Sequence, residues 1–200
     1  MGIRSLSAAS ISTGAKRSKF WDQSSVLNSY ESIATATVGS GGQAEINFTS
    51  IPGTYKHLQL RGIVDTNRSA YFLDYGVLVL NSDTNTNYSL HHMYAEGTST
   101  FSYGEPNWAN AQILRLGGDG TGSIADAYGV FILDIIDYSN TNKFKVLKNF
   151  GGANMNADAE MGLYSFLWRS TSAVTSIKIT PGGGSLFKQY SEISLYGIKG

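Results

Sequence analysis

Residues 130–136 read Val130-Phe131-Ile132-Leu133-Asp134-Ile135-Ile136, the most hydrophobic run of the chain. The run is short and rich in β-branched side chains, which favours a buried strand over a helix. A tight polar segment, Tyr138 to Asn142, separates it from a second apolar segment, Phe144 to Leu147. Two apolar segments joined by a short polar turn predict a β-hairpin.

Similar strand signals recur along the rest of the chain at intervals of roughly 8–15 residues. Glycine- and proline-rich breaks separate them, and no segment keeps a helical apolar period for three turns. We therefore expect an all-β fold, an antiparallel β-sandwich of jelly-roll type with about ten strands, with a closed barrel as the competing architecture. The further expected strands are 33–38, 44–49, 58–61, 77–80, 88–94, 113–116, 161–169, 174–179 and 192–198.

The composition limits the classes of partner. The 200 residues fit one domain with a short appendage. The 15 Lys and Arg balance the 15 Asp and Glu, and only 15% of residues are charged, against about 25% in an average soluble domain. A neutral chain has no general electrostatic attraction for nucleic acid or anionic membrane, so we expect neither as a partner. The absence of cysteine excludes disulfides, thiolate catalysis and cysteine-based zinc sites.

The first 29 residues differ from the remainder. They contain four basic residues before the first acid, Asp22, and few apolar ones. We interpret 1–29 as an extended basic attachment arm that leads into a β-sandwich domain at 30–200; a frayed terminus is the alternative. The residues expected to anchor a partner are Arg4, Lys16, Arg17, Lys19, Phe20 and Trp21.

Two loops invite a chemical interpretation that their residues do not support. Gly117 to Gly122 is glycine-rich but lacks the lysine and the following helix of a phosphate-binding loop, so we expect a hairpin turn. Asn81 to Asn87 places oxygen-bearing side chains at alternate positions, as a calcium loop does. It offers only one acid, Asp83, so a solvated turn stabilised by Asn and Asp side chains is favoured.

The titratable residues give no catalytic grouping. His91 and His92 are adjacent, so on a strand they face opposite sides and cannot hold one metal together; the third histidine is His57. Asp134 and Asp137 could serve glycoside hydrolysis, but their odd spacing favours opposite faces and structural roles. We therefore expect no enzyme activity, no catalytic residue, no metal site and no cofactor.

Aromatic residues gather between positions 88 and 108. Exposed rings beside amide side chains suit stacking against sugars, and tyrosine and tryptophan are also enriched at subunit contacts. The sequence predicts either a glycan patch or a subunit contact here, with the contact favoured. The residues are Tyr88, Tyr94, Phe101, Tyr103 and Trp108, expected mostly in a loop from about Glu96 to Trp108.

Three stretches of sequence, which follow one another along the chain, resemble segments of a known class of proteins. They are Tyr30 to Ala34 together with Ile51 to Gly62, then Asp134 to Lys143, then the ending Tyr190 to Gly200. Taken in order, they are similar to small virion structural proteins of tailed bacteriophages, described as tail-fibre or head-decorating proteins. The resemblance implies a component of the virus particle, often trimeric, in place of an enzyme.

The expected function is thus a fibre or capsid-decoration protein located in the virion and held to a neighbouring virion protein through residues 1–29. The alternative is a glycan-binding module that recognises host surface sugars during host attachment; a depolymerase ranks third. We also expect a homotrimer, because few charged residues and 24 aromatic ones suggest surface that is covered by other copies. Residues 129–136 and 161–169, apolar on both faces, are expected nearest the shared axis.

Overall fold

The computed structural model describes residues 29–120, 122–155 and 159–200. Among these residues it contains twelve strands and one short 3₁₀ turn, and no helix that is long and apolar enough to cross a membrane. The strands are β1 (Tyr30–Thr37), β2 (Ile46–Phe48), β3 (His57–Val64), β4 (Leu73–Leu80), β5 (Tyr88–Glu96), β6 (Ser99–Trp108), β7 (Ala111–Gly117), β8 (Gly129–Ile136), β9 (Lys145–Asn154), β10 (Ala159–Trp168), β11 (Ile177–Pro181) and β12 (Glu192–Ile198), with the 3₁₀ turn η1 at Gly182–Gly184.

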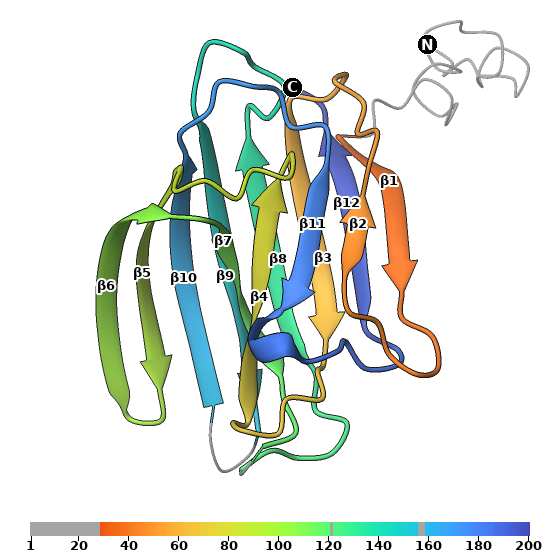
Figure 1. Cartoon of the computed structure of the whole chain (residues 1–200), viewed down its shortest axis with the longest axis vertical. Helices are drawn as coiled ribbons and strands as arrows, with labels where there is room; N and C mark the ends of the chain where they lie inside the picture. The colour runs from red at the N-terminus through yellow and green to blue at the C-terminus, as the bar shows by residue number, and fades with distance from the viewer. Residues whose placement is uncertain (1–28, 121, 156–158) are drawn as a thin grey trace, which may run out of the picture.

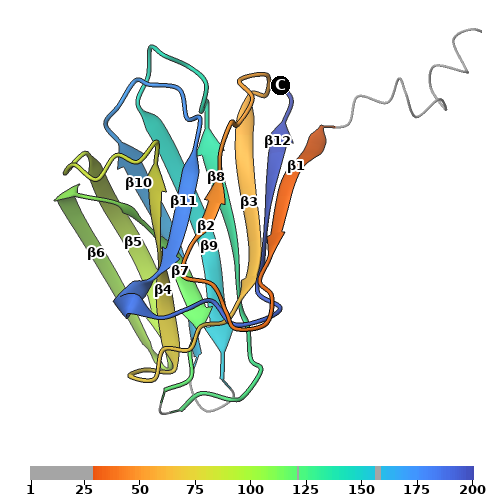
Figure 2. The same ribbon diagram turned by 45° about the vertical axis from the view of Figure 1, so that its right-hand side comes forward.

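The strands form two sheets packed face to face (Figures 1 and 2). One sheet has eight strands in the order β1-β12-β3-β8-β9-β10-β5-β6, and the other has four in the order β2-β11-β4-β7. Without the hairpin β5–β6 and the pair β9–β10, the orders become β1-β12-β3-β8 and β2-β11-β4-β7, the interleaved arrangement of a jelly roll. The all-β sandwich expected from the sequence is confirmed.

The two additional pairs enlarge only one sheet. The β5–β6 hairpin is inserted between β4 and β7, and β9–β10 between β8 and β11, yet all four strands extend the larger sheet beyond β8. The β5–β6 hairpin forms the left edge of the molecule in Figure 1. The larger sheet therefore presents a wide outer face, which the smaller sheet does not cover.

The hairpin predicted around Tyr138 to Asn142 is confirmed, because β8 and β9 pair as antiparallel neighbours. The loop between them is stabilised by Lys145, whose side chain is fully buried beneath it. Its ammonium donates to the backbone oxygens of Asn140 (2.6 Å), Lys143 (2.8 Å) and Thr171 (3.1 Å). A polar turn and a buried cation thus close this hairpin together.

Two local expectations were wrong. The segment expected as a loop from Glu96 to Trp108 is mostly strand β6, the edge strand of the larger sheet. Pro106 is tolerated there because an edge strand leaves one row of backbone groups unpaired. Gly117 to Gly122 is not a hairpin turn, since β7 and β8 belong to different sheets.

The core lies between the two sheets and takes up many aromatic side chains. Nine aromatic residues of the described chain are buried there or at its edge: Phe48, Phe72, Tyr88, Phe131, Tyr138, Tyr164, Phe166, Trp168 and Phe187. Burial of a large aromatic side chain removes on the order of 150–250 Å² from water. The core therefore takes up nine of the 24 aromatic residues, and the prediction of a trimer stays a prediction.

Candidate functional site

The outer face of the eight-stranded sheet carries apolar side chains in register. Ile63 on β3 pairs with Val130 on β8, and the same row continues through Gly152 to Met161. In the next row, Ile132 on β8 pairs with Phe150 on β9, followed by Leu163 on β10 and Met93 on β5. These two rows, the outer apolar face, contain seven apolar residues on five adjacent strands: Ile63, Met93, Val130, Ile132, Phe150, Met161 and Leu163.

All seven side chains are strongly exposed, with between 42% and 60% of their surface accessible. Soluble monomers rarely expose contiguous apolar patches larger than a few hundred Å². The patch is also hollowed, with one depression of about 880 Å³ between β8 and β6 and another of about 670 Å³ toward Met161. Phe150 and Ile132 line both depressions, so the apolar rows form one continuous, indented surface.

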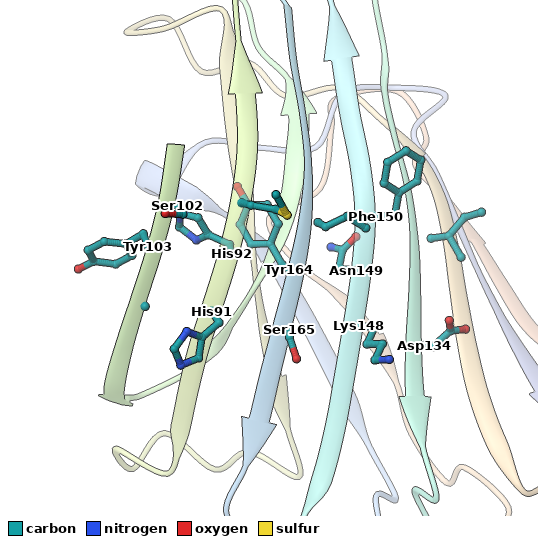
Figure 3. Close-up of a pocket in the computed structure, with 14 residues that line it drawn as sticks. His91, His92, Ser102, Tyr103, Asp134, Lys148, Asn149, Phe150, Tyr164 and Ser165 are labelled. Carbon is teal, nitrogen blue, oxygen red and sulfur yellow. The ribbon is translucent and has the colours of Figure 1, made fainter. Parts of the chain in front are cut away.

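A row of polar side chains borders the outer apolar face. Gln59, Asp134, Lys148, Ser165 and His91 occupy consecutive register positions from β3 to β5. Figure 3 shows His91, Ser165, Lys148 and Asp134 at one level across neighbouring strands. Asp134 and Lys148 form an adjacent pair of opposite charges, so this border holds both signs side by side.

The polar row is ordered by its own hydrogen bonds at the β3 end. The Gln59 amide donates to Asp134 Oδ1 (2.7 Å) and its oxygen accepts from Arg61 Nε (2.7 Å). The Arg61 guanidinium lies 5.5 Å from the ring centre of Tyr30 and 5.4 Å from that of Tyr196. Asp134 is therefore held by a hydrogen bond from Gln59, a structural contact between β3 and β8.

Asp137 lies in the loop after β8 and belongs to a separate group of charges. Its carboxylate contacts Lys143 Nζ (2.8 Å) and Lys56 Nζ (3.2 Å). These two cations, Lys143 first, lower the pKa of Asp137 to about 2. The separate partners of Asp134 and Asp137 give each carboxylate a structural role.

We expect removal of Lys143 to raise the pKa of Asp137. In Lys143→Met the stronger of the two cationic contacts is lost, so the pKa should move from about 2 toward the ordinary aspartate value of about 3.9. Because the pKa of the folded state is depressed, this carboxylate stabilises the fold above about pH 4, and its contribution is lost as the pH falls toward 2. Titration of the carboxyl carbon by NMR measures the shift; Lys178→Met is the control, and an unchanged Asp137 pKa in Lys143→Met would contradict the assignment.

The calcium-like loop is held by hydrogen bonds among its own side chains, and the two adjacent histidines face apart. Asp83 accepts hydrogen bonds from the side chains of Asn85 (2.9 Å), Asn87 (2.9 Å) and Trp168 (2.7 Å). Its partial burial opposes ionisation, yet these donors hold its pKa below the usual value. His91 and His92 point to opposite faces of β5, as expected from their spacing. No group of three potential metal ligands occurs among the described residues.

The aromatic residues predicted as one patch separate into core and surface. Tyr88 is fully buried and its hydroxyl accepts a hydrogen bond from the Leu80 backbone (3.0 Å), so its assignment to an exposed contact was wrong. Burial is also the main cause that raises the pKa of Tyr88. Trp108 is half-buried against the core, whereas Tyr103 remains 45% exposed and Phe101 46% exposed. Tyr94 is half-buried and stacks on Phe101 with 4.9 Å between ring centres.

Sequence reasoning identified two strands of the outer apolar face but missed the others. Residues 129–136 and 161–169 were expected to be apolar on both faces, and each contributes two exposed apolar residues. Ile63, Met93 and Phe150 were not identified, because their exposure depends on which face of the sheet each one lies on. The six residues proposed to anchor a partner, Arg4, Lys16, Arg17, Lys19, Phe20 and Trp21, lie outside the described residues.

Comparisons with known proteins leave the chain unassigned. No family model matches it, and no curated protein matches it. One solved structure, a protein of unknown function from Shewanella oneidensis MR-1, aligns over 84% of this chain and 75% of its own length at 9% identity, with a TM-score of 0.24. A likeness this low carries no argument about function.

Proposed function

We propose that the protein is a structural component of a tailed-phage virion, a fibre or decoration protein that assembles with copies of itself through the outer apolar face. The observation that carries the proposal is the pair of exposed apolar rows from Ile63 to Met93. Apolar surface of this extent on a soluble domain marks an interaction site. The resemblance of three sequence stretches to phage structural proteins supplies the biological setting.

The chemistry of this surface favours a protein partner over a sugar. Six of its seven apolar side chains are aliphatic or methionine, and Phe150 is the single aromatic ring. Sugars bind best to flat aromatic faces, whereas aliphatic side chains and methionine pack well against other side chains. The proposal assigns this surface a structural role and no catalytic step.

A second copy of the same chain is the occupant that the charges favour. The chain has a formal net charge of zero, so copies do not repel one another. The adjacent Asp134 and Lys148 give the border of the face one charge of each sign, and a symmetric contact can pair such charges between copies. We propose a homotrimer, with β8 and β10 nearest the shared axis and residues 1–29 reaching a neighbouring virion protein.

Mass spectrometry of purified phage particles tests the function. We expect the protein to be present in a fixed ratio to the major capsid or tail proteins after the particles are banded in a density gradient. A host protein removed by the same purification serves as the control for contamination. Absence of the chain from intact particles would overturn the proposed function.

A further inference from the structure

The inner face of the β5–β6 hairpin is a second exposed surface, on the opposite side of the sheet from the outer apolar face. Its side chains pair across the hairpin in successive rows: Tyr94 with Phe101, and then His92 with Tyr103. The rings form a continuous contact series. Tyr94 and Phe101 stack at 4.9 Å, and His92 lies 5.4 Å from both Tyr94 and Tyr103.

Carboxylates stand at both ends of this aromatic series. Near the turn, Glu96 accepts a hydrogen bond from the hydroxyl of Tyr71, a ring that is itself 37% exposed. At the other end, Glu105 accepts hydrogen bonds from the Tyr103 hydroxyl and from the indole N–H of Trp108. These donors, Tyr103 first, lower the pKa of Glu105. Both carboxylates are thus held in place beside exposed rings.

The dimensions suit a short linear ligand. Successive inward positions along a strand lie about 6.8 Å apart, so the rows from Glu96 to Glu105 span on the order of 20 Å. Exposed ring faces contact the apolar C–H faces of sugar rings, and fixed carboxylate oxygens accept hydrogen bonds from sugar hydroxyls. A line of exposed rings with a fixed acceptor at each end therefore suits a short oligosaccharide.

The negative charge of the inner face of the β5–β6 hairpin indicates which class of oligosaccharide can bind there. No ion pair of the described chain involves Glu96 or Glu105. Two uncompensated carboxylates repel uronic acids, sialic acids and phosphorylated sugars. The ligand is therefore expected to be uncharged.

We propose that the inner face of the β5–β6 hairpin binds a neutral oligosaccharide, stacked on Phe101 and Tyr103 and hydrogen-bonded to Glu96 and Glu105. The site goes beyond the proposed structural role, because it uses a different face of the sheet. It revises the aromatic patch expected from the sequence: Tyr88 is excluded, Phe101 and Tyr103 are kept, and Tyr71 and the two glutamates are added.

The test is binding of the full-length protein to a panel of immobilised oligosaccharides. The panel contains neutral hexose and N-acetylhexosamine oligomers, together with the same backbones carrying uronic or sialic acid. We expect saturable binding to at least one neutral member, and weakening on the order of tenfold or more in Phe101→Ala and in Tyr103→Ala, since each removes one stacking ring. Phe144→Ala, which removes an equally exposed ring outside the hairpin (49%), should bind as the unmodified protein does.

The controls separate this site from the assembly surface. Phe150→Glu places a charge on the outer apolar face and should leave oligosaccharide binding unchanged, whatever its effect on assembly. Thermal unfolding of each variant confirms that it is folded. The proposal is overturned if no neutral oligosaccharide binds saturably, if only acidic members bind, or if folded Phe101→Ala and Tyr103→Ala both bind normally.

Discussion

Replacement of Phe150 by glutamate is expected to dissociate the protein into monomers. The mass in solution should fall from three times 21.6 kDa, about 65 kDa, to that of the single chain. Phe150 lies at the centre of the outer apolar face, with Ile132 and Leu163 beside it in the same row. A partner that covers this position would bury the new carboxylate, at a cost of several kcal/mol in the absence of a paired cation.

The size of this effect follows from comparing the free energy gained by burying apolar side chains with the free energy lost by burying a charge. Complete burial of one large apolar side chain contributes about 1.5–3 kcal/mol. Seven half-exposed side chains therefore contribute several kcal/mol on association, before the loss of translational and rotational freedom is subtracted. The free-energy cost of burying one unpaired carboxylate is comparable to the net free energy of association that is left. A single substitution should therefore be enough to dissociate the trimer.

Native mass spectrometry or light scattering at micromolar concentration measures the effect. Phe144→Glu adds the same charge at an equally exposed aromatic residue outside the face (49%) and should leave the mass unchanged. Leu163→Glu, on the neighbouring strand, should dissociate the protein as Phe150→Glu does. A monomeric unmodified protein, or a trimer that survives both outer-face substitutions, would show that this surface is not the contact between copies.

The strands of the core could be predicted from the sequence because their signals are local. Residues 130–136 form a continuous apolar run rich in β-branched side chains, and residues 192–198 are also rich in apolar side chains; β8 (Gly129–Ile136) and β12 (Glu192–Ile198) lie where expected. The β5–β6 hairpin was missed in part, because Ser99–Trp108 contains Gly104, Pro106 and five residues with polar side chains. An edge strand needs neither two apolar faces nor a full set of backbone donors.

The candidate sites depend on which strands are neighbours in the sheet. Strand pairing cannot be inferred from any short stretch of sequence. Ile63, Ile132, Phe150 and Leu163 are far apart in sequence but meet because β3, β8, β9 and β10 are adjacent. Tyr88 and Tyr103 belong to the same aromatic cluster in sequence, yet Tyr88 is buried in the core and Tyr103 is 45% exposed on the edge strand β6. Composition alone could not separate them.

Replacement of Asp74 by alanine is expected to be the most destabilising single substitution among the polar residues of the fold, at about 3–5 kcal/mol. Asp74 is the second residue of β4 (Leu73–Leu80) and is fully buried. Its carboxylate accepts hydrogen bonds from the Thr66 hydroxyl (3.0 Å), the Tyr75 backbone N–H (2.8 Å) and the Ser185 hydroxyl. It also pairs with the Arg68 guanidinium at 3.3 Å.

These contacts join three segments that are distant in sequence. They connect the chain after β3 (His57–Val64), the start of β4 (Leu73–Leu80) and the loop after η1 (Gly182–Gly184). Alanine leaves Arg68 without its counter-charge and the Tyr75 N–H without its acceptor, so the desolvation of these groups is no longer compensated. The Thr66 and Ser185 hydroxyls lose the carboxylate and keep only backbone oxygens as acceptors. Asp74→Asn keeps the shape and part of the hydrogen bonding, and its loss should be smaller than that of alanine.

Urea unfolding followed by circular dichroism measures both substitutions at one fixed protein concentration, because subunit dissociation makes the apparent stability depend on concentration. Glu45→Ala removes an exposed carboxylate with a single side-chain contact, Asn47 (2.8 Å), and should change the free energy of unfolding by less than about 0.5 kcal/mol. The pair Arg68→Ala and Asp74→Ala, singly and together, isolates the ion pair from the hydroxyl contacts. If Asp74→Ala costs no more than Glu45→Ala, the buried carboxylate does not stabilise the junction of these three segments, and the packing of β4 against β7 and β11 holds it instead.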